Sequence, residues 1–137
     1  MQAATAFFSK TYGEAMGLLV EARDYLSYRE PIDRQTLGQL DRLRFCCETT
    51  RLTARLTQVM AWLLAQRAVH AGEISQQEAL CGHGPLAALE VCMDGEDEAR
   101  APLPRGLLSL LDRSRRLYIR VARLDELARR QTDCAYS

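Results

Sequence analysis

The residue types best suited to hold a metal are thinly spread in this sequence. Cys81 and His83 form the one close Cys/His pair, and His70 and Cys92 are the nearest further candidates. Zinc sites usually combine a Cys-x2–4-Cys pair with a matching second pair, and the sequence has no such arrangement. We therefore expect no metal and no cofactor, and interpret this segment as a turn with an unpaired histidine and a packed cysteine.

The usual signatures of catalysis are also missing. Cys46 and Cys47 fall inside a predicted helix with no histidine near them, and no serine stands in a Gly-x-Ser-x-Gly setting. No Gly-rich phosphate loop follows a strand, because no strand is predicted. Glu96 and Glu98 lie in a predicted loop without an apolar pocket that could raise a carboxyl pKa. We expect no catalytic residues and no enzymatic activity.

The composition is typical of one globular domain, residues 1–137. The chain is 47% hydrophobic and 26% charged with a formal net charge of zero, which argues against bulk attraction to nucleic acid or anionic membrane. No apolar run approaches the roughly 20 residues that a membrane span needs, and the first residues do not resemble a signal peptide. Five cysteines without a Cys-x-x-Cys pair favour a reduced cytoplasmic protein with idle thiols.

Helical periodicity predicts the first two elements. A single apolar stripe marks a helix over about 8–28, and Pro31 ends it because proline disfavours helix in the residue before it. The second helix is expected over about 34–71, with Asp33 as its N-cap and Gly72 as its stop.

The second helix differs from an ordinary surface helix because it has two apolar stripes. They lie on nearly opposite sides: Phe45, Leu52, Leu56, Val59 and Leu63 on one, and Leu40, Leu43, Cys47, Ala54, Ala61 and Ala65 on the other. Two partner helices do not need so much apolar surface. We therefore expect a central helix packed on both sides, and a homodimer built mainly around this helix and one other long helix.

A third helix is predicted over about 105–130, with an apolar face opposite a row of arginines. Before it, residues 73–103 break the pattern with glycines, prolines and an acidic patch (Asp94, Glu96, Asp97 and Glu98). A short tail, 131–137, follows. The predicted fold is all-α: a three-long-helix bundle with an irregular acidic connection before the third helix.

The zero net charge is a cancellation between segments. Residues 71–103 carry one basic and seven acidic side chains, whereas residues 33–70 carry six and three and residues 104–137 carry eight and four. Opposed patches of this kind suit binding to other proteins.

We select candidate protein-contact residues from the two Arg-rich helices. They are Arg44, Arg51, Arg55 and Trp62, expected to be exposed on one flank of the second helix, and Arg113, Arg116, Arg120 and Arg123 on the third. An alternative is a nucleic-acid-associated helical regulator that uses the same arginines, although the zero net charge and the absence of helix-turn-helix spacing count against it. A purely structural dimer is the third reading.

Several motifs, taken in order, carry a family resemblance over about residues 7–130. They are Phe7, Phe8 and Tyr12; Leu-Leu-Val-Glu-Ala-Arg-Asp-Tyr-Leu at 18–26; Leu40-x-x-Leu43-Arg44; Glu48-Thr49-x-Arg51-Leu52-Thr53-x-Arg55-Leu56; Met60-x-Trp62-Leu63-Leu64; Leu103-Pro104; and Ser114-x-x-Leu117-Tyr118-x-Arg120-Val121-x-Arg123-Leu124-Asp125. Together they resemble the RcdA family, the regulators of CtrA degradation of alphaproteobacteria.

The resemblance implies a dimeric three-helix bundle without enzymatic activity. It implies an adaptor that delivers clients, among them a transcriptional regulator, to the AAA+ protease ClpXP during the cell cycle, after a response-regulator adaptor has primed the unfoldase. The family member with the best-known role has a longer flexible C-terminal tail than 131–137, so tail-dependent steps are the part of this expectation that transfers least directly.

Overall fold

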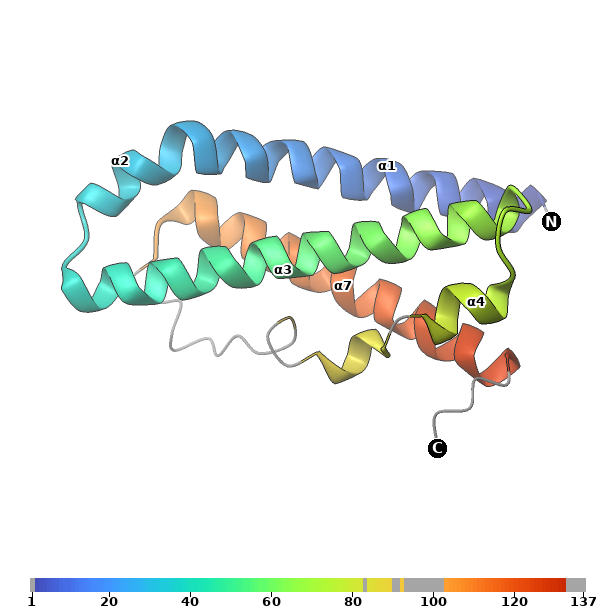
Figure 1. Cartoon of the computed structure of the whole chain (residues 1–137). Helices are drawn as coiled ribbons and strands as arrows, with labels where there is room; N and C mark the ends of the chain where they lie inside the picture. Colours follow the sequence, from blue (N-terminus) through green and yellow to red (C-terminus); the bar gives the residue numbers. More distant parts are fainter. Residues whose placement is uncertain (1, 83, 90–91, 93–102, 133–137) are drawn as a thin grey trace.

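The structure, a computed structural model, describes residues 2–82, 84–89, 92 and 103–132, and it contains helices and no strand in these ranges, as predicted. The elements are α1 (Gln2–Asp24), the π-helical η1 (Tyr25–Arg29), α2 (Glu30–Gln35), α3 (Gln39–His70), α4 (Gln76–Cys81), the 3-10 turn η2 (Leu86–Ala88) and α7 (Arg105–Gln131). The long helices α1, α3 and α7 all pack on one another. Figure 1 shows that α3 and α7 run in the same direction and that α1 is antiparallel to both.

The shared direction of α3 and α7 explains the long connection between them. A chain that leaves α3 at one end must travel back along the bundle before α7 can start, and α4 and η2 lie on this return path (Figure 1). Ser75 caps α4, because its Oγ accepts a hydrogen bond from the Glu78 amide at 3.1 Å. The acidic patch at 94–98, His83 and the tail beyond 132 lie outside the described residues.

The first helical segment, predicted over about 8–28, is longer in the structure. We expected it to end near residue 28, but α1 passes through η1 into α2, and helix continues to Gln35. Pro31 stands in the first turn of α2, directly after the π turn. The π turn before it is held by Tyr25, a buried side chain whose hydroxyl donates to Asp33 Oδ2 at 2.9 Å.

The second helix therefore starts later than predicted. Asp33, expected as its N-cap, lies inside α2, and Gly38, in an extended conformation, precedes α3 instead. The far end agrees with the sequence: α3 stops at His70, and Gly72 has a φ of 77°, a left-handed conformation that favours glycine.

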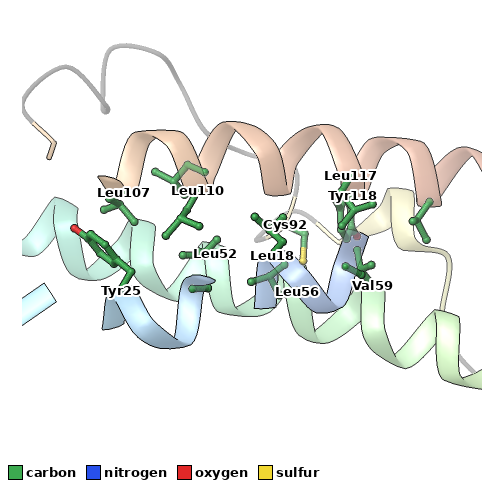
Figure 2. Close-up of a cluster of buried hydrophobic side chains, with 14 of the residues drawn as sticks. Leu18, Tyr25, Leu52, Leu56, Val59, Cys92, Leu107, Leu110, Leu117 and Tyr118 are labelled. Atoms are coloured by element: carbon green, nitrogen blue, oxygen red, sulfur yellow. The ribbon is translucent and has the colours of Figure 1, made fainter. Parts of the chain in front are cut away.

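The core contains one of the two apolar stripes of α3. Phe45, Leu52, Leu56, Val59 and Leu63 are all buried. They pack with Leu18 and neighbouring small residues of α1 and with the apolar face of α7, which includes Leu107, Leu110 and Leu117 (Figure 2). Fully burying each leucine stabilises the fold by about 1.5–3 kcal/mol before entropy costs.

The described part of the chain leaves the amino-terminal part of the other stripe exposed. Leu40 and Leu43 are each 62% exposed and Cys47 is exposed, whereas Ala54 is partly buried against the core. Both α1 and α7 bury the first stripe, so the expectation that α3 packs on both sides is wrong for the Leu40 to Cys47 part of the second stripe.

The contact between the Tyr25 ring and α7 leaves no room for a side chain at Gly106. A Cβ on Gly106 would lie 2.9 Å from Tyr25 Cε2, inside normal contact distance. Because hydrogen bonding to Asp33 holds the tyrosine ring, the larger side chain in Gly106→Val should lower the free energy of unfolding by about 1–3 kcal/mol. Urea unfolding followed by circular dichroism measures this.

The matched control is Gly17→Val, because a Cβ on Gly17 has nothing within 4 Å. Valine is the better helix former, so this variant should be as stable as the parent or slightly more stable. Equal losses at both positions would contradict the packing argument.

Candidate protein-contact site

The arginine face of α7 is tied to α1 by two ion pairs. Arg113 pairs with Glu21, and Arg120 Nη2 lies 2.6 Å from Glu14 Oε1. Both pairs are spaced seven residues along antiparallel helices, which is two turns, so they lie on one flank of the bundle. All four side chains are about half exposed, so each pair contributes roughly 0–1 kcal/mol. Their main effect is to fix the spacing of charges on the surface.

A groove of about 500 Å³ lies between these pairs. Its lining includes Gly17 and Leu18 of α1 together with Arg116. Arg116 is 76% exposed and pairs with Asp112 at 2.8 Å on its own helix. We call this surface the charged groove: Glu14, Gly17, Leu18, Glu21, Arg113, Arg116 and Arg120. Arg123 is also exposed on α7, outside this lining.

Sequence reasoning identified the arginines of the charged groove and missed its glutamates. Glu14 and Glu21 look like ordinary surface residues of the first helix. The available signal was their seven-residue spacing, which matches that of Arg113 and Arg120 on α7. Only the antiparallel packing of α1 and α7 shows that the two sets meet.

Arg55 is the clearest correction among the predicted site residues. We expected it to be exposed, but the side chain is completely buried. Its Nε donates to the Cys92 carbonyl at 2.7 Å, and Nη1 donates to the Leu111 carbonyl at 3.0 Å and lies 3.4 Å from Ser114 Oγ. The flank that carries Arg55 faces α7 and the returning connection, so this residue supports the fold and does not contact partners directly.

The other predicted residues of α3 range from exposed to half-buried. Arg44 is exposed, with Asp41 at 4.0 Å. Arg51 is largely covered and forms an ion pair with Glu48, whose carboxylate is buried. The four residues expected together on one exposed flank therefore do not form one surface.

Trp62 is partly buried and belongs to a second polar cluster around Asp125. Its Nε1 donates to Asp125 Oδ1 at 3.0 Å. The fully buried Asp125 carboxylate also accepts from the Leu86 amide at 3.2 Å and from Arg129 Nε at 2.9 Å. The Tyr118 hydroxyl donates to the Leu86 carbonyl, and burial raises the pKa of this phenol well above its ordinary value. The tyrosine thus stays a neutral donor.

The thiols differ from expectation at one position. Cys46 and Cys47 are free and exposed, and Cys92 is free and buried, with its pKa raised by desolvation. Cys81, however, is disulfide-bonded, so the view that all cysteines are idle thiols is wrong.

Neither metal binding nor membrane crossing has a candidate in the described part of the chain. No group of three or more His, Cys, Asp or Glu residues there could hold a metal ion. Within the same ranges, no helix combines the length and hydropathy that crossing a bilayer requires.

Comparison with known proteins gives one family match and a similar solved structure, and no match among curated proteins. A family model described as "Protein of unknown function (DUF1465)" matches residues 1–136. Among solved structures, the chain is similar to RcdA from Caulobacter crescentus CB15, with 40% sequence identity and a TM-score of 0.71 over 88% of this chain and 89% of that one. No curated protein matches significantly. Neither match names an enzyme.

The Arg55 hydrogen bonds predict a stability defect. Arg55→Met keeps much of the side-chain volume but leaves the Cys92 and Leu111 carbonyls without this donor. Unmade bonds to buried acceptors are costly, so the free energy of unfolding should fall by about 2–4 kcal/mol, measured by urea titration at fixed protein concentration.

Arg44→Met is the matched control, because Arg44 is exposed on the same helix. It should stay within about 0.5 kcal/mol of the parent. A similar, small effect for both variants would mean that the buried hydrogen bonds contribute little.

Proposed function

The chain belongs to the RcdA family, to which the DUF1465 model also assigns it, and from this premise we propose that it is a non-enzymatic adaptor in regulated proteolysis. It would bind client proteins and help deliver them to ClpXP, with a response-regulator adaptor on the unfoldase and a transcriptional regulator among the clients. In this role the protein would act in the cytoplasm, in proteolysis that is regulated during the cell cycle.

The observation that carries the proposal is the character of the surface. A bundle with a well-packed core keeps large apolar side chains exposed on α1 and α3, including Leu19, Val20, Leu40 and Leu43. Exposed apolar side chains that gather on one surface are typical of protein interaction sites. The charged groove adds a second surface of a different kind, which suits recognition of another protein by charge complementarity.

The adaptor mechanism needs no chemistry from the chain. A scaffold that holds client and protease together raises their effective concentration, and affinity for the pair can exceed either single affinity by about 10²–10⁴. A bundle in which α1, α3 and α7 all pack on one another gives two surfaces a fixed separation, which is the geometric condition for holding two partners at once.

The nucleic-acid alternative loses support from the pairing of its arginines. Arg113, Arg116 and Arg120 each have a carboxylate partner within the same chain. A phosphate backbone would have to displace these acids or accept them beside it. A mixed-charge groove fits a protein partner better than a polyanion.

We also propose that the chain is a homodimer assembled through α3 and α1. A groove of about 300 Å³ lies between these helices and is lined mainly by apolar and small side chains, among them Leu19, Leu26 and Thr53. The exposed stripe of α3 continues beside it. A second copy laid along this surface would bury both.

Sedimentation tests the dimer. The parent chain should sediment as a dimer at micromolar concentration, and Leu43→Asp should give monomers because it places a charge in the buried interface. The matched control is Leu127→Asp, since Leu127 is similarly exposed but lies on α7. A parent monomer at these concentrations, or equal effects of both variants, would refute the α3 interface.

Reconstituted proteolysis tests the adaptor role. Adding the chain to ClpXP, its response-regulator adaptor and a transcriptional-regulator client should accelerate client degradation. Arg116→Glu should slow the stimulated rate by about tenfold, because a reversed charge repels a partner that is complementary to the groove.

The matched control is Arg34→Glu. Arg34 is also exposed and paired with a carboxylate four residues away, but it lies on α2. Stimulation should persist in this variant. No stimulation by the parent chain would overturn the proposed function, and equal losses in both variants would remove the charged groove from it.

A further inference from the structure

A small pocket lies where α1, α3 and α7 meet near the carboxyl end of α3. Phe8 and Thr11 contribute from α1, Trp62, Gln66 and His70 from α3, and Leu124 from α7. Its volume is about 130 Å³ and its lining is mainly apolar. The pocket is separate from the charged groove and from the α1–α3 surface proposed for the dimer, since it shares no lining residue with either.

Gln66 gives this pocket a polar group that the fold does not use. The residue is only 7% exposed, and its side-chain Nε2 is buried with no hydrogen-bond partner among the described residues. Buried donors in native proteins nearly always have an acceptor, so an unpartnered one requires an explanation. A ligand that brings an acceptor into the pocket would satisfy this amide.

The walls of the pocket favour an aromatic ring. Phe8 and His70 meet edge to face with 5.5 Å between their centroids, and Trp62 lines the same space. The indole nitrogen of Trp62 is already engaged by Asp125, so this side chain is fixed as an apolar wall. Aromatic side chains pack well against such edges and faces.

The size of the pocket limits what it can hold. Sites for whole small molecules usually measure about 300–1,000 Å³, whereas an apolar cavity of about 150 Å³ accepts a single benzene ring. A free ligand of that size gains little buried area to offset its lost translational freedom. A side chain on a larger partner has further contacts, and buried aromatic anchors of this kind dominate many protein interfaces.

We propose that this pocket binds one tyrosine side chain of a partner protein, with the ring among Phe8, Trp62 and His70 and the phenol oxygen accepting a hydrogen bond from Gln66 Nε2. Tyrosine supplies both the ring that the walls fit and the acceptor that Gln66 lacks. This inference rests on the proposed protein-binding role of the chain and adds the chemistry by which one surface recognises its partner.

The chain carries its own reporter for the test. Trp62 is the single tryptophan of the sequence and lines the pocket, so its fluorescence reports occupancy. Titration of the full chain with p-cresol, the tyrosine side chain in isolation, should give a saturable change. Toluene, which lacks the hydroxyl, should bind about threefold to tenfold more weakly. No saturable change with p-cresol, or equal affinity for the two probes, overturns the proposal.

Substitution at the donor sharpens the test. Gln66→Leu replaces the amide with an apolar side chain, so p-cresol should bind about threefold to tenfold more weakly while toluene is unaffected. Gln58→Leu, on the same helix but outside the pocket, is the matched control and should match the parent. Unchanged p-cresol affinity in Gln66→Leu also overturns the proposal.

Short peptides distinguish a partner's side chain from a free phenol. A Gly-Ser-Tyr-Ser-Gly peptide should displace p-cresol, and the same peptide with alanine in place of tyrosine should not. A tyrosine peptide that does not compete would make this a small-molecule site and overturn the proposal. These measurements use neither protease nor client, so failure of the pocket is distinguishable from failure of the adaptor role in the degradation assay.

Discussion

The packing of this bundle depends on burying the guanidinium of Arg55 with its hydrogen bonds made. A charged side chain inside a core is tolerated only when its donors are satisfied. Here the acceptors come from two other parts of the chain, the Cys92 carbonyl of the connection and the Leu111 carbonyl of α7. The apolar stripes alone leave α3 and α7 free to slide by a turn, since leucines recur along both. The fixed positions of these carbonyls remove that freedom.

Asp125 of α7 also joins α3 to the connection through buried hydrogen bonds. Its buried carboxylate receives Trp62 from α3 and the Leu86 amide from the connection. The two buried charges therefore each bind a backbone group of the irregular returning segment. Such a segment has few helical hydrogen bonds of its own, and its buried backbone groups must find partners elsewhere. The same arrangement places Trp62 as a rigid wall of the pocket that contains Gln66.

The spacing of apolar residues was sufficient to predict which face of each helix is apolar. It was insufficient to predict burial and contacts that depend on residues far away in the sequence. The buried stripe from Phe45 to Leu63 follows from 3.6 residues per turn, and so does the arginine face of α7. Arg51 and Arg55 are four residues apart on one flank, yet only Arg55 is fully buried, because the position of α7 and Cys92 decides it. Pro31 was a misleading stop, since a π turn and the Tyr25–Asp33 hydrogen bond let helix continue past it. Neither Glu14 opposite Arg120 nor the pocket at Gln66 could be predicted without the packing of α1.

The position of α1 relates the proposed surfaces to one another. One flank of α1 borders the charged groove with α7, and another borders the apolar groove with α3. A second copy that covers the apolar groove leaves Arg116 and its neighbours in contact with solvent, because the two grooves share no lining residue. Apolar burial supplies affinity with little selectivity, whereas charge complementarity chiefly sets specificity and association rate. A single helix that separates the two kinds of surface would let the proposed assembly and partner recognition be tuned by different residues, as the proposed adaptor role requires.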